Sequence, residues 1–151
     1  MNTDKKIQHS LNDLIEIARD GGDFYAEAAN KVDSAELAAL FNSMAGHKRE
    51  IVAGLSAEVA AAGGDPADRG TMVGSMHQVY TKARAAMGDT TYAYVAELEE
   101  LEDRLLNAFK ETLQDSDTPA PARAAAQKFL PRVTECHDIM RNRKSALKNA
   151  H

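Results

Sequence analysis

Apolar side chains recur every three to four residues along most of the chain, the period that places them on one face of an α-helix. This pattern predicts four long helices, over about residues 4–29, 34–62, 89–114 and 119–147, and a shorter one over 71–87. No stretch alternates apolar and polar residues in the manner of a strand, and only four prolines and nine glycines interrupt the pattern. The sequence therefore predicts an all-α protein.

The order of these segments predicts a ferritin-like four-helix bundle with a short crossover helix between its second and third long helices. The loop sequence GGDPADRG precedes residues 71–87, and Gly88-Asp89 follows them. A helix of this length spans about 25 Å, enough to travel along a small bundle. The long helices on either side of it would then run parallel, as in bundles with one long connection. We expect residues 1–151 to form a single domain.

Three charged side chains fall inside the predicted apolar faces. Glu99 and Glu102 flank Val95 on the helix wheel of the third long helix, and Lys48 lies within the apolar face of the second. A buried carboxylate without a partner costs several kcal/mol or takes up a proton. The rest of the bundle must therefore supply partners for both glutamates.

The predicted topology brings four polar residues to one level of the bundle. His137 lies inside the apolar face of the last helix, and a turn midway between the last two helices places it beside Glu99. Lys48 and Glu102 lie about equally far from the starts of their parallel helices, with His47 one position away. We therefore expect Lys48, Glu99, Glu102 and His137 to converge.

This convergence has two interpretations. In the first, Lys48 and His137 neutralise the two glutamates in a buried ion-pair network that needs no metal. In the second, iron or manganese binds to carboxylate and imidazole ligands, with Glu99, Glu102, His137 and His47 as candidates. Lys48 opposes a site for two metal ions, because its ammonium repels cations.

Charge and composition narrow the classes of partner. The formal net charge of −5 disfavours non-specific binding to nucleic acid, which a basic face would supply. The chain has no apolar run long enough to span a bilayer. Its single cysteine, Cys136, fits a reducing cytosol, so we expect a cytoplasmic protein. Ile17 and Phe24 form a small apolar ridge beside the first helix's main face, which predicts contact with the crossover helix or with a second copy in a homodimer.

Four segments resemble a bacterial family of unknown function whose members are described as ferritin-like four-helix-bundle proteins: NDLIEIARDGGDFYAEAA, GGDPADRGTMVGSMHQVY, ELEELEDRLLNAFKETL and ECHDIMRNR. The resemblance covers nearly the whole chain and implies the same fold. In it, the acidic motif of the family falls on Glu97, Glu99 and Glu102, and its histidines fall on His77 and His137.

The chain departs from the wider rubrerythrin and ferritin pattern of a glutamate on helix one and Glu-x-x-His on helices two and four. Its first helix has no inward carboxylate, and Lys48 and Ile51 stand where the second helix would carry Glu and His. We therefore predict a non-enzymatic bundle that acts by self-association or by binding a protein partner, whose identity the sequence leaves open. The alternative is a metal-binding protein with oxidoreductase activity.

Overall fold

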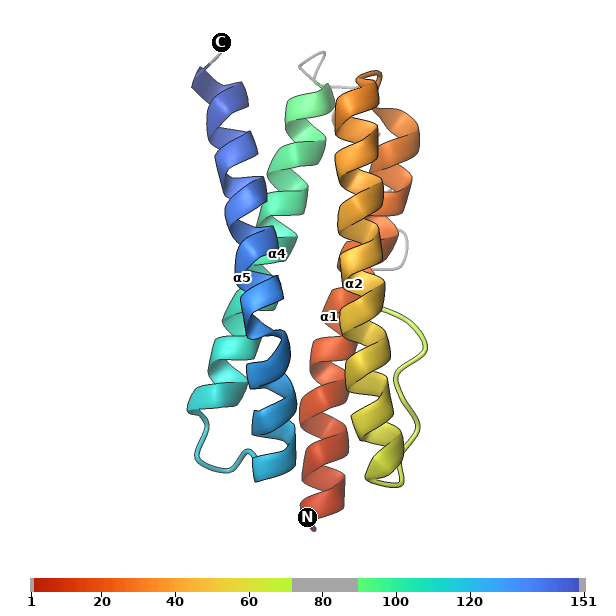
Figure 1. Cartoon of the computed structure of the whole chain (residues 1–151), viewed down its shortest axis with the longest axis vertical. Coiled ribbons are helices and arrows are strands. Elements are labelled where there is room, and N and C mark those ends of the chain that lie inside the picture. Colours follow the sequence, from red (N-terminus) through yellow and green to blue (C-terminus); the bar gives the residue numbers. More distant parts are fainter. Residues whose placement is uncertain (1, 72–89, 150–151) are drawn as a thin grey trace.

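The computed structural model describes residues 2–71 and 90–149, which fold into four long helices without a strand (Figure 1). The helices are α1 (Thr3–Lys31), α2 (Ala35–Ala61), α4 (Thr90–Gln114) and α5 (Ala120–Asn149). The all-α prediction is confirmed for this part of the chain, and the helices begin and end within a few residues of the predicted positions. None of these four helices is both long and apolar enough to cross a membrane.

Short polar residues and a glycine set several helix ends. The Asn2 side chain accepts a hydrogen bond of 2.8 Å from the backbone N–H of Lys5 at the start of α1. The Ser34 hydroxyl oxygen accepts a hydrogen bond from the backbone N–H of Leu37 at the start of α2. Gly63 follows α2 with a φ of 82°, a left-handed conformation that glycine adopts without a steric penalty.

The helices form two antiparallel pairs, α1 with α2 and α4 with α5, so that α2 and α4 run in the same direction (Figure 1). After α2 the chain turns back along α1. Asn12 bonds the backbone of Asp65 and Ala67, and Asp20 accepts bonds of 2.7 and 2.6 Å from the N–H and hydroxyl of Thr71. The predicted crossover helix, 71–87, lies outside the described residues apart from Thr71, and it stays a prediction.

Asp20 is an exception to the expected polarity of α1. It lies off the main apolar face, yet it is only 6% exposed. The returning chain covers it, because both carboxylate oxygens accept hydrogen bonds from Thr71. The buried Asp20 carboxylate therefore holds the chain that follows α2 against α1.

Two apolar clusters fill the bundle, one toward each end. The first joins residues 7–18 of α1 to residues 51–59 of α2, and the second joins residues 24–29 of α1 to residues 37–45 of α2, each with matching parts of α4 and α5. Lys48 falls between these clusters along α2, as Glu102 does along α4. The middle layer of the bundle is therefore where its buried charges lie.

The Ile17–Phe24 ridge is covered in part by the chain itself. Phe24 is 2% exposed and packs edge-on against the Tyr94 ring, with 6.0 Å between the ring centroids. Ile17 is half-buried against the first apolar cluster. The homodimer inferred from this ridge stays a prediction.

Candidate metal site and buried ion pair

Lys48 and Glu102 form an ion pair in the middle layer of the bundle. The Lys48 Nζ donates a hydrogen bond of 2.8 Å to Oε2 of Glu102 and lies 2.7 Å from Oε1. The two residues are 1% and 0% exposed. The Tyr25 hydroxyl donates a second bond of 2.8 Å to Oε2. The buried carboxylate therefore receives two donors from α1 and α2.

Two consecutive glycines of α1 make room for the lysine. A β-carbon added at Gly21 or Gly22 would lie 3.4 Å from the Lys48 side chain. Two adjacent glycines inside a helix mark either a kink or a close approach of another helix. In the structure α1 continues through them, and the methylene groups of Lys48 lie against their backbone. The glycines therefore mark a close approach.

Burial also sets the protonation of the groups around this pair. Burial raises the pKa of Tyr25 well above its ordinary value, and the negative charge and hydrogen bond of Glu102 raise it further. Tyr25 therefore remains a hydrogen-bond donor at neutral pH. Burial likewise raises the pKa of the Cys136 thiol, which is fully buried, although the nearby Lys48 ammonium opposes that shift. This thiol is consequently poorly suited to act as a nucleophile.

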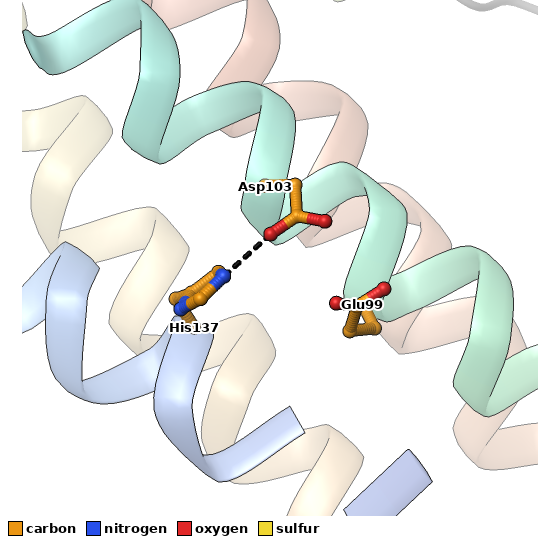
Figure 2. Close-up of side chains that lie close together, drawn as sticks. All are labelled: Glu99, Asp103 and His137. Carbon is orange, nitrogen blue, oxygen red and sulfur yellow. Dashed lines mark hydrogen bonds and ion pairs between the residues drawn. The ribbon is translucent and has the colours of Figure 1, made fainter. Parts of the chain in front are cut away.

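A second cluster lies at the junction of α4 and α5 (Figure 2). Glu99 and Asp103 are one turn apart on α4, and His137 faces them from α5. One ligand atom from each of these three residues lies within 4.8 Å of the other two. The Nε2 of His137 contacts Oδ1 of Asp103, and its Nδ1 lies 3.1 Å from Oδ1 of Asp138. Each nitrogen of the imidazole therefore has its own carboxylate.

The two carboxylates control the charge of the imidazole. Burial lowers the pKa of His137, but the hydrogen bonds and negative charges of Asp138 and Asp103 outweigh it and leave the pKa above the ordinary 6.5. A protonated ring donates a hydrogen bond to both partners. A neutral ring protonated at Nδ1 donates to Asp138 and leaves the lone pair of Nε2 for a cation.

Residues 6–115 match the model of a family described as a domain of unknown function, DUF2383. The chain belongs to this family. No curated protein matches it, and no solved structure does. The predicted membership of a family of unknown function is therefore confirmed, whereas nothing in these comparisons names a ferritin-like family. The match includes both acidic residues of the α4 cluster and ends before His137.

In this DUF2383 chain the four polar residues predicted to converge divide between two places. Lys48 and Glu102 form the buried pair, whereas Glu99 and His137 lie in the half-buried cluster on the α4–α5 side. Glu99 also contacts Lys144, whose Nζ lies 3.4 Å from Oε2.

The fourth metal-ligand candidate, His47, lies on α2, with its Nδ1 3.9 Å from Oε2 of Glu50. Two side chains of these clusters, Tyr25 and Asp103, were not expected from the sequence. The helical period places Tyr25 on the apolar face of α1, and the signal that could have found its role is that a buried tyrosine hydroxyl usually needs a partner. Asp103 lies outside the apolar face of its helix, so the apolar pattern gives no signal for it.

Proposed function

We propose that this DUF2383 chain binds one divalent transition-metal ion between α4 and α5, through Glu99, Asp103 and His137. The observation that carries the proposal is the approach of three ligand atoms, from three side chains on two helices, to within 4.8 Å of one another. Two carboxylate oxygens and one imidazole nitrogen suit manganese, iron or zinc. Within residues 2–71 and 90–149, no other group of three acidic, histidine or cysteine side chains meets the same criterion.

The contact between Asp138 and the Nδ1 side of the His137 ring supports this proposal. Metal-binding histidines usually donate their second ring N–H to a carboxylate or carbonyl, which fixes the tautomer and the orientation of the ring. The Nδ1 of His137 lies 3.1 Å from Oδ1 of Asp138, while Nε2 points toward Asp103. A neutral His137 held in this way presents its lone pair to an ion between the two acidic residues of α4.

The buried Lys48–Glu102 pair supports a metal site away from the centre of the bundle. Dinuclear ferritin-like sites need several carboxylates free to bind metal at the core. Glu102 instead receives the Lys48 ammonium and the Tyr25 hydroxyl. A metal ion there would face a fixed positive charge in a medium that screens charge poorly. We therefore propose metal binding without the redox chemistry of a dinuclear centre, which retains the non-enzymatic role predicted from the sequence.

Calorimetric titration of the full chain tests the proposal. Protein purified without an affinity tag and treated with chelator is titrated separately with Mn²⁺, Zn²⁺ and, under nitrogen, Fe²⁺. We expect one ion per chain for at least one of these metals. His137→Ala and Asp103→Asn should weaken binding by at least tenfold, because each removes a direct ligand.

His47→Ala is the matched control, because it removes an imidazole from α2 and leaves the α4–α5 cluster intact. Its affinity should equal that of wild type. If none of the three metals binds, or if His47→Ala weakens binding as much as His137→Ala, the proposed site is wrong.

A further inference from the structure

A pocket of about 420 Å³ lies between α1 and α2, on helices other than those of the metal cluster. Small side chains of both helices line it, among them Ala18, Ala26 and Ala53. The stem of Lys48 also lines the pocket, but its ammonium is directed to Glu102. The volume falls in the range that small-molecule sites occupy.

Ser56 lines this pocket and has a buried hydroxyl without a partner in the described part of the chain. Buried polar atoms in folded proteins nearly always have a hydrogen-bond partner, because an unpaired one loses its hydration without compensation. The unpaired hydroxyl therefore leaves one hydrogen bond that a bound ligand or a water molecule can complete.

Two arginines give the pocket a positive character. The Nε of Arg19 donates a bond of 2.8 Å to the carbonyl oxygen of Ala67, which holds the guanidinium at the pocket while its terminal nitrogens bond no acceptor within residues 2–71 and 90–149. Arg49 lines the same pocket from α2 and is exposed. Asp23 is the carboxylate among the lining residues. Two guanidinium groups against one carboxylate favour a negatively charged ligand.

We propose that this pocket binds a small organic anion, a carboxylate or a phosphate monoester with a short apolar body. The anionic group would accept hydrogen bonds from Arg19 and Arg49, and the small residues of the two helices would surround the apolar part. The Ser56 hydroxyl would gain the partner that it lacks. This site is independent of the proposed metal site, because the two share no residue.

Titration of the ¹⁵N-labelled full chain with three probes of equal chain length tests the proposal. Hexanoate and hexyl phosphate carry the proposed anionic groups, and hexylammonium carries the opposite charge on the same body. We expect at least one anion to produce saturable shifts of the amide signals of residues 19–26 and 49–56. Comparison of the two anions then identifies the preferred head group, and hexylammonium should leave these signals unchanged.

Removing a positive or a negative side chain from the pocket should change the affinity for the anion in opposite directions. Arg49→Gln should weaken binding of the anion by about tenfold, because it removes a charge-assisted hydrogen bond. Asp23→Asn should strengthen binding by a few fold, because it removes the repelling carboxylate. Arg141→Gln, at an exposed position of α5, is the matched control and should bind as wild type does.

The Ser56→Ala variant tests whether the Ser56 hydroxyl binds the anion or only stabilises the fold. It removes an unpaired polar atom, so the free protein should melt at the same temperature as wild type or higher, yet bind the anion less tightly. The proposal is overturned if neither anion produces saturable shifts, if hexylammonium binds as well as the anions, or if Asp23→Asn weakens binding.

Discussion

The ammonium of Lys48 lies 2.7 and 2.8 Å from the two carboxylate oxygens of Glu102, and neither residue is more than 1% exposed. The pair lies in the middle layer of the bundle, with an apolar cluster on either side. Neither partner can be lost without leaving the other charge uncompensated. This pair lies at the level of the bundle where one interpretation of the sequence predicted a metal site.

Replacement of Lys48 by methionine should destabilise the protein severely. Breaking a buried ion pair from one side costs about 3–5 kcal/mol, because the remaining charge stays buried without a partner. Urea denaturation followed by circular dichroism measures the loss. Lys144→Met is the matched control, since Lys144 pairs with Glu99 near the surface and such pairs contribute at most about 1 kcal/mol.

The same urea denaturation experiments, repeated with Mn²⁺ or Fe²⁺, distinguish the two interpretations of the core. If the pair is purely structural, added metal does not restore the stability of Lys48→Met. Rescue by metal would show instead that Glu102 binds a cation once the ammonium is gone. A Lys48→Met protein as stable as wild type would contradict the burial of this charge altogether.

Two glycines of α2 should respond oppositely to alanine. A β-carbon at Gly54 would lie 2.0 Å from Cζ of Phe129 on α5, whereas at Gly46 it would meet no atom within 4 Å. Gly54→Ala should therefore destabilise by about 1–3 kcal/mol, the usual cost of overpacking. Gly46→Ala should stabilise by up to about 1 kcal/mol, because alanine is the better helix former.

Urea denaturation of both variants measures this difference, and Phe129→Leu in the Gly54→Ala background should recover part of the loss. If Gly54→Ala is as stable as Gly46→Ala, then α5 does not pack against α2 as closely as the structure shows.

The charge of His137 should link stability and metal binding to pH. Its folded pKa lies above the unfolded value of 6.5. The imidazolium therefore contributes stability that is complete below about pH 6.5 and is lost as the pH rises through the folded pKa. Metal binding needs the neutral ring, so metal affinity should rise with pH over the same window.

Two-dimensional NMR of the histidine side chains gives this pKa directly, and urea denaturation at several pH values gives the stability. His137→Asn should remove this part of the pH dependence of stability. A pKa of His137 below 6.5 would show that burial outweighs the two carboxylates, and the direction of the pH effects would reverse.

Some features of this protein could be predicted from its sequence and others could not, depending on the physical rule that determines each one. The helical period of apolar residues located α1, α2, α4 and α5, because each long helix buries one face. Counting along parallel helices paired Lys48 with Glu102, and the pair lies in contact. Equal depth suffices there, because side chains on parallel helices lean in the same direction along the bundle.

The same counting was less accurate between the antiparallel helices α4 and α5. Side chains lean toward the N-terminus of their own helix, so those on antiparallel helices lean in opposite directions. Contacting pairs consequently come later in each helix than a count from the turn indicates. The count from the turn predicts that His137 lies beside Glu99, and ligand atoms of the two residues lie within 4.8 Å. The hydrogen-bond contact of its Nε2, however, is with Asp103, one turn further along α4. The direction of the side chain, and not the depth of its backbone, decides this contact.

The last prediction concerns Lys144 and the proposed metal site. Its Nζ lies 3.4 Å from Oε2 of Glu99, so the ammonium holds a carboxylate that the metal would also use. Lys144→Met should strengthen Mn²⁺ binding by roughly twofold to tenfold, because it removes a competing cation whose effect partial exposure and salt weaken. The gain in affinity should shrink as the salt concentration is raised.

Lys148→Met replaces an exposed lysine on the same helix; it is the matched control and should bind Mn²⁺ as wild type does. Weaker Mn²⁺ binding by Lys144→Met would mean that the lysine positions Glu99 for the metal and does not compete with it.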